Sequence, residues 1–93
     1  MIRRSRVPRS TDVRVTFTLP MDEPAGPVSV VGDFNDWTPG TTPLVKRANG
    51  TRSASVTLPS GTSVRFRYLG ENGRWFDDHE ADAVDEHGGV VTV

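Results

Sequence analysis

Apolar and polar residues alternate along short stretches of this chain, which is the pattern of half-buried β-strands. In residues 13–19 every odd-numbered residue from Val13 to Leu19 is apolar, and the residues between them are polar. In residues 63–69 the even-numbered residues are apolar or aromatic and are predicted to point inward; they are Val64, Phe66 and Tyr68. Both stretches are therefore predicted to be strands with one buried face.

Further short segments hold β-branched or aromatic residues between turn signals and are also predicted to be strands. These segments are residues 28–31, 43–47, 52–58, 75–76 and 88–93. Asn49-Gly50 and Asn72-Gly73 are strong hairpin signals, and residues 20–27, with three prolines, are predicted to be a loop. No window has helical periodicity with caps at both ends. The pattern predicts an all-β antiparallel sandwich of about six to seven strands.

The two ends of the chain differ in charge. Arginines crowd residues 1–10, which lack apolar periodicity and are predicted to form a flexible basic arm. The arm suits a phosphate-bearing partner, but a solvated tail, or a tail that pairs with the acidic C-terminal third, is the preferred interpretation. Residues 11–93 are predicted to form a single β-sandwich domain.

Composition narrows the classes of function. The 93 residues carry a net charge of −1 and no cysteine, so neither a thiolate zinc site nor a general attraction to nucleic acid or membrane is expected. The basic start has no apolar region behind it, and no apolar run is long enough to span a bilayer. A cytoplasmic location, no cofactor, no nucleic-acid partner and no membrane partner are the expectations. The oligomeric state is left open.

Catalytic and metal-binding chemistry find little support in the sequence. The histidines, His79 and His87, lie in the acidic segment 77–87, and no glycine elbow flanks a serine. The acids and imidazoles of that segment match neither an EF-hand nor a zinc-protease spacing, so a solvated acidic loop is preferred to a metal site. The chain is therefore predicted not to be an enzyme.

Two tryptophans stand outside the regular inward positions. Trp37 lies in a polar loop and Trp75 directly after a hairpin turn. Either could fill the core, as tryptophan often does in small sandwiches, but exposure is the preferred interpretation, whereas Phe34 is expected to fold back onto the core. An exposed indole matches the apolar face of a sugar ring. Arg67, with Asn35 or Asp36, would supply hydrogen bonds to hydroxyl groups.

These residues resemble a known family. The run Val28-Ser-Val-Val-Gly-Asp-Phe-Asn-Asp-Trp-Thr-Pro39, followed by Leu58-Pro-Ser-Gly61, Arg65-Phe-Arg-Tyr68 and Gly73-Arg-Trp75, is similar to carbohydrate-binding module family 48. That family comprises the isoamylase and branching-enzyme N-terminal early set domains and the glycogen-binding domain of the AMP-activated protein kinase β subunit. The resemblance covers the chain from about Val13 to Val93.

The resemblance implies an immunoglobulin-like sandwich that binds α-1,4-linked glucan such as glycogen or starch. It implies that Trp37 and Trp75 stack on sugars, that Arg67 stands where the glycogen-binding members carry lysine, and that Val84 lies near their loop leucine. Those members also use an asparagine just before the last strand, whereas this chain reads His87-Gly88-Gly89 there. One polar contact is therefore missing or replaced.

Two functions follow as expectations. The first is a non-catalytic α-glucan-binding module. The alternative is a protein-interaction module whose aromatic surface docks a glycogen-metabolism enzyme or another partner, since exposed aromatic patches also suit interfaces.

Overall fold

The structure, a computed structural model, describes residues 1–22 and 24–93. Within these residues the chain forms nine strands and two short 3₁₀ turns. They are β1 (Ile2–Arg6), β2 (Asp12–Pro20), β3 (Ser29–Gly32), η1 (Asp33–Asn35), β4 (Val45–Lys46), β5 (Thr51–Pro59), β6 (Ser63–Leu69), η2 (Glu71–Gly73), β7 (Trp75–Phe76), β8 (Ala83–Asp85) and β9 (Gly88–Thr92). The prediction of an all-β chain is confirmed.

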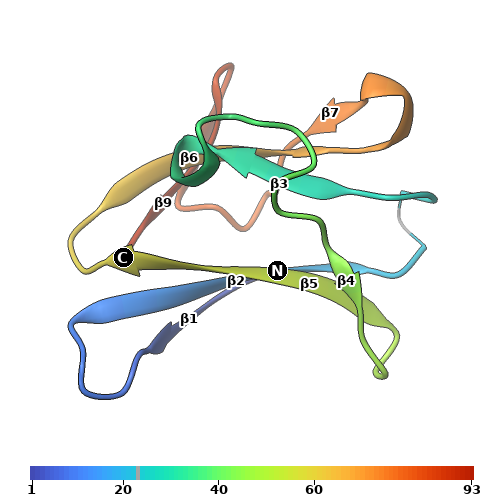
Figure 1. Cartoon of the computed structure of the whole chain (residues 1–93). Coiled ribbons are helices and arrows are strands. Elements are labelled where there is room, and N and C mark those ends of the chain that lie inside the picture. The colour runs from blue at the N-terminus through green and yellow to red at the C-terminus, as the bar shows by residue number, and fades with distance from the viewer. Residues whose placement is uncertain (23) are drawn as a thin grey trace.

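The described strands form two antiparallel sheets that lie face to face (Figure 1). One sheet has the order β1-β2-β5-β4, and the other has the order β3-β6-β9-β8, with β7 paired to β6 beyond the end of β9. This architecture is the predicted β-sandwich. The part of the chain that the structure describes contains no helix with the length and hydropathy of a membrane span.

The core lies between the two sheets and follows the alternation in the sequence. Val15 and Phe17 from β2 are fully buried, as are Phe66 and Tyr68 from β6. The Phe17 and Phe66 ring centroids are 4.8 Å apart. Phe34 packs against this cluster, with its ring stacked 5.9 Å from Phe17, as expected. Alternation along the strands therefore identifies the buried face correctly.

One buried polar group accompanies this aromatic cluster. The Tyr68 hydroxyl donates a 2.7 Å hydrogen bond to the carboxylate of Asp78, which is only 7% exposed and also accepts the backbone N–H of Glu80 at 2.9 Å. Burial, followed by the hydrogen bond to Asp78, raises the pKa of Tyr68 above its ordinary range. The residues after β7 are thereby attached to the core.

The N-terminal segment differs from the predicted arm. Residues 2–6 form β1, which pairs with β2 from Ile2↔Phe17 to Arg6↔Val13. Arg4 reaches from this strand to the other sheet and donates to both carboxylate oxygens of Asp82 at 2.8 and 2.7 Å. The expected pairing with the acidic C-terminal third is thus present at Arg4. Backbone hydrogen bonds build this polar edge strand, which is why apolar periodicity does not reveal it.

Two other segments also differ from the expectations. The acidic segment 77–87 was expected to be irregular, yet residues 83–85 form β8, antiparallel to β9. The expected loop of residues 20–27 begins one residue late, because β2 continues through Pro20. Glu23 in that loop lies outside the described residues.

A buried arginine supports the loop after β2. Arg52 of β5 is 4% exposed, and its guanidinium donates to the carbonyl oxygens of Pro20, Pro24 and Gly26 at 3.1, 2.5 and 2.6 Å. Among the described residues Arg52 forms no ion pair. Backbone carbonyls therefore satisfy a charged group inside the sandwich.

Candidate functional site

The outward face of β6 carries the residues between the two tryptophans. Along this strand Val64, Phe66 and Tyr68 are buried, while Arg65, Arg67 and Leu69 are half-buried on the other face. The short hairpin through η2 pairs Leu69 with Trp75. Because directly paired residues project to the same side of a sheet, Trp75 lies on the outward face, where 42% of it is exposed.

The other tryptophan is presented by the loop that follows β3. The 3₁₀ turn η1 follows β3 directly. The two residues after η1, Asp36 and Trp37, have left-handed φ angles of 54° and 55°. Aspartate adopts such a backbone more often than most other residues do, but for a bulky residue such as tryptophan it is a genuine outlier. The Trp37 N–H donates to the Gly32 carbonyl at 2.9 Å, which closes the turn. Trp37 is half-buried and Asp36 is exposed.

Asn35 has a different role from the one expected of it. Its side-chain oxygen accepts the Gly32 N–H at 3.1 Å, and its amide nitrogen donates to the Val30 carbonyl and the Thr42 hydroxyl at 3.0 and 3.1 Å. These bonds occupy the amide inside the loop. Asn35 therefore shapes the turn that carries Trp37 and does not present a free amide at the surface.

Asp33 connects this loop to β6. Its Oδ1 accepts the Trp37 indole N–H at 2.8 Å, and its Oδ2 accepts the Arg65 backbone N–H at 2.8 Å. The Trp37 loop thus reaches β6 at Arg65, while Trp75 pairs with the same strand at Leu69. Four residues of β-strand span roughly 13 Å, so the two tryptophans flank an elongated strip of the sheet.

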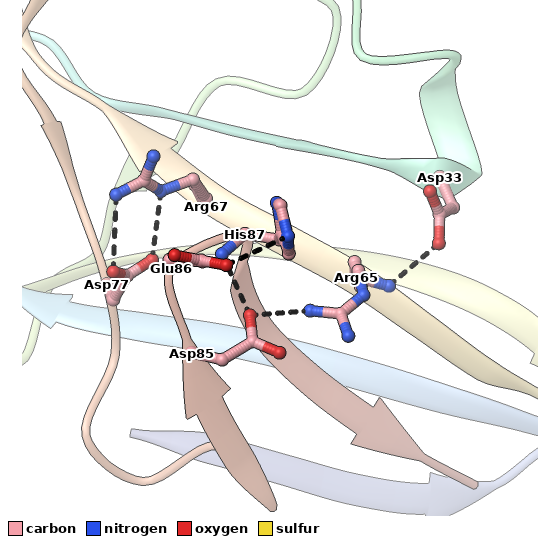
Figure 2. A network of polar contacts seen from close by, with 7 residues as sticks. All are labelled: Asp33, Arg65, Arg67, Asp77, Asp85, Glu86 and His87. Carbon is pink, nitrogen blue, oxygen red and sulfur yellow. Dashed lines mark hydrogen bonds and ion pairs between the residues drawn. The ribbon is translucent and has the colours of Figure 1, made fainter.

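Arg67 lies in the middle of this strip and is not a free cation. Its Nε and Nη2 donate to the two carboxylate oxygens of Asp77 at 3.1 and 3.3 Å (Figure 2). Among the described residues its Nη1 has no hydrogen-bond partner. A Cβ added at Gly88 would come within 2.8 Å of Arg67 Cγ. The Gly88 position therefore has no room for an asparagine side chain, which the resemblance leads one to expect near this position. Glycine there accommodates Arg67.

Arg65 is paired in a similar way. Its guanidinium donates to Asp85 at 2.8 Å, and the same Asp85 oxygen accepts the His87 N–H at 2.8 Å (Figure 2). The hydrogen bond from Arg65, followed by that from His87, lowers the pKa of Asp85 below its ordinary value. The Thr92 N–H and then Arg4 lower the pKa of Asp82 in the same manner. The acidic segment therefore supplies partners for arginines on the strands and is not a simple solvated loop.

These lowered pKa values predict how stability depends on pH. A carboxyl whose pKa is lower in the folded than in the unfolded state stabilises the fold above its unfolded pKa of about 4, and this contribution is lost as the pH falls through the folded pKa. The unfolding free energy of the wild type, measured with urea, should therefore decrease as the pH falls below about 4. The unfolding free energy of Asp82→Asn should decrease less steeply with falling pH, because asparagine does not titrate. Asp22→Asn removes the same charge from an exposed loop and is the control; identical pH slopes for the two variants would contradict the assignment.

Val84 lies on the other side of the sheet from Arg67. It pairs with Gly89 of β9, and Gly89 pairs with Phe66, whose side chain points into the core. The register thus assigns Val84 to the core-facing side, at an edge where it is 44% exposed. Of the expected site residues, Arg67 and Trp75 lie on the outward face of β6, and the loop that holds Asp36 and Trp37 is joined to the same strand through Asp33.

The structure also assigns roles that sequence reasoning missed. Asp33 and Asp77 hold Trp37 and Arg67, yet neither was among the residues expected at the site. A signal for Asp77 was present: continuing the register Leu69↔Trp75 by two places sets Arg67 opposite Asp77, an opposite-charge cross-strand pair. Within residues 1–22 and 24–93 no group of three or more potential metal ligands is gathered.

Comparisons with known proteins give two relatives. No protein-family model matches the chain. It is 38% identical over 63 residues to 1,4-alpha-glucan branching enzyme GlgB of Aquifex aeolicus (strain VF5), covering 67% of this chain and 10% of that enzyme. It is 28% identical over 94 residues to amylopullulanase of Thermoanaerobacter thermohydrosulfuricus, covering 87% of this chain and 6% of that enzyme. The chain therefore spans a tenth or less of these relatives and is similar to a segment of two carbohydrate-active enzymes.

Proposed function

We propose that this chain is a non-catalytic α-glucan-binding module of the carbohydrate-binding module family 48 type. Its ligand would lie along the outward face of β6, between Trp37 and Trp75. The observation that carries the proposal is that both tryptophans are connected to β6, Trp37 through Asp33 at Arg65 and Trp75 by pairing with Leu69, with Arg67 between these two points. Similarity to segments of a branching enzyme and an amylopullulanase supports an α-glucan as the ligand.

The chemistry of the face suits a neutral sugar chain. An exposed indole offers a flat apolar surface for the C–H face of a pyranose ring, and Trp75 is 42% exposed. Arg67 is held by Asp77 through two of its nitrogens, which leaves Nη1 to donate to a sugar hydroxyl in a defined direction. A shallow face with few donors binds weakly, so we expect a Kd in the micromolar to millimolar range.

One carboxyl group on this face, that of Asp85, bears on the non-catalytic part of the proposal. Hydrolysis of a glycosidic bond needs a carboxylic acid that is protonated near neutral pH, which requires a raised pKa. Asp85, which lies beside Arg65 on this face, has a pKa below its ordinary value instead. It therefore stays ionised at neutral pH and is unsuited to donate a proton to a leaving group.

Titration with maltoheptaose, followed by amide NMR shifts, tests the proposal. The wild type should bind at up to millimolar ligand, and Trp75→Ala should weaken binding by roughly twofold to tenfold, because stacking on one aromatic ring contributes about 0.5–1.5 kcal/mol. Val45→Ala removes another exposed apolar side chain, 50% exposed on β4 of the other sheet, and should bind as the wild type does. A wild type with no shifts at millimolar maltoheptaose would overturn the proposal, as would unchanged binding by Trp75→Ala.

A docking function is the second candidate, and one observation favours it. The relatives are at least ten times longer than the matched segment, so in those enzymes the segment belongs to a larger polypeptide. The same aromatic face would then dock a glycogen-metabolism enzyme or another protein. A pull-down with and without added glucan separates the two functions: a partner retained equally in both supports docking, and a partner lost when glucan is absent supports glucan binding.

A further inference from the structure

Trp37 is held in a backbone conformation that its surroundings must maintain. Its φ of 55° follows an equally left-handed Asp36, and each such residue costs on the order of 1 kcal/mol. The conformation persists because hydrogen bonds surround it: Trp37 N–H to the Gly32 carbonyl, and the three bonds of the Asn35 amide. These bonds set the path of the backbone, but none of them touches the indole ring.

Asp33 is the residue that fixes the ring. It uses one oxygen for the indole N–H of Trp37 and the other for the backbone N–H of Arg65, both at 2.8 Å. A carboxylate is suited to this task because both of its oxygens accept hydrogen bonds. The indole is thereby joined through a single side chain to β6, the strand that also carries Arg67.

We infer that Asp33 is a positioning residue that sets the Trp37 ring for ligand binding. This inference rests on the proposed function, since it concerns the same face. Its consequence is chemical as well as geometric. The indole N–H is the only hydrogen-bond donor of a tryptophan side chain, and Asp33 occupies it. Trp37 therefore offers a ligand only its ring surface, in an orientation fixed before binding, which reduces the entropy lost when the ligand binds.

The test uses Asp33→Asn in the whole chain. Asparagine keeps one acceptor oxygen but replaces the other with a donor, so it cannot accept from both Trp37 and Arg65. We expect the indole N–H resonance of Trp37 to shift in the ligand-free protein while that of Trp75 stays in place. Maltoheptaose affinity should fall by roughly threefold to tenfold, as expected when one hydrogen bond of ordinary net strength is lost.

A double-mutant cycle separates positioning from a general loss of structure. Trp37→Phe keeps an aromatic face but has no N–H, so Asp33→Asn should weaken binding in the wild type and have little further effect in Trp37→Phe. Asp82→Asn is the matched control, because Asp82 also accepts a backbone N–H and a side-chain donor, from Thr92 and Arg4. It should leave the Trp37 resonance and the affinity unchanged.

The outcomes distinguish the two claims. If the wild type binds maltoheptaose and Asp33→Asn binds equally well, the positioning role is overturned and the proposed function stands. Equal weakening by Asp33→Asn in the wild type and in Trp37→Phe also overturns it, since the effect would not pass through the indole N–H. If the wild type does not bind, the proposed function fails, and the positioning role for glucan fails with it.

Discussion

Replacing Phe17 with alanine is expected to lower the free energy of unfolding by about 3–5 kcal/mol. Phe17 is fully buried on β2, and its ring lies 4.8 Å from that of Phe66, 5.9 Å from that of Phe34 and 6.4 Å from that of Tyr68. Alanine would leave a cavity at the point where both sheets and η1 meet. Urea unfolding followed by circular dichroism measures the change.

The same substitution should also disturb the candidate site. Phe34 belongs to η1, between Asp33 and Asn35, and without Phe17 its ring loses a stacking partner. The loop that carries Trp37 should therefore loosen, and its indole resonance should broaden or shift. Leu58→Ala, a core truncation on the neighbouring strand β5, is the control: it should also destabilise the chain but leave that resonance in place. An equal effect on the resonance by both variants would show that Phe17 has no special role in supporting the loop.

Replacing Arg52 with methionine should cost about 2–4 kcal/mol of unfolding free energy. The guanidinium donates to three carbonyls, that of Pro20 at the end of β2 and those of Pro24 and Gly26 in the loop after it. Methionine has similar length but no donor, so three backbone acceptors in or near the sandwich would lose their partners. Lysine should rescue only part of the loss, because one ammonium cannot match a planar fork that reaches three carbonyls.

The matched control for Arg52 is an exposed arginine in the same part of the sheet. Arg47 follows β4, and its guanidinium donates to Ser53 at 2.9 Å. Arg47→Met should change the unfolding free energy by no more than about 0.5 kcal/mol, as is usual for surface positions. If Arg52→Met proved as stable as Arg47→Met in urea, the loop would not depend on Arg52.

Sequence reasoning identified the strands that have an apolar face and missed those that do not. Phe17 and Phe66 lie on the buried faces that alternation assigns to β2 and β6. β1 has one apolar residue, Ile2, in an otherwise polar strand, and its place beside β2 depends on backbone hydrogen bonds that any sequence can form. Arg52 precedes Ala54 by two residues and so shares its inward face, yet its burial was missed. The reason is that a buried charge is improbable until its partners are known.

The local settings of the two tryptophans can be predicted from the sequence, whereas the contacts of the polar residues around them cannot. Trp37 and Trp75 stand out because a loop and a hairpin turn are unusual settings for a tryptophan. Asn35 and Val84 were grouped with them by nearness in sequence or by resemblance. In the structure the Asn35 amide is used inside the loop, and the register of β8 assigns Val84 to the core-facing side.

The sequence by itself determined the alternation of apolar residues, the hairpin turns, and hence an all-β sandwich with Trp75 next to the end of β6. These features are local, since each depends on residues within a few positions of one another. Only the tertiary structure decided which polar groups pair: Arg4 with Asp82, Arg65 with Asp85, and the Trp37 indole with Asp33, which also binds β6. The reason is physical, because a charged or polar side chain has many chemically equivalent partners along the chain, and only the stacking and register of the two sheets bring one of them within hydrogen-bond distance.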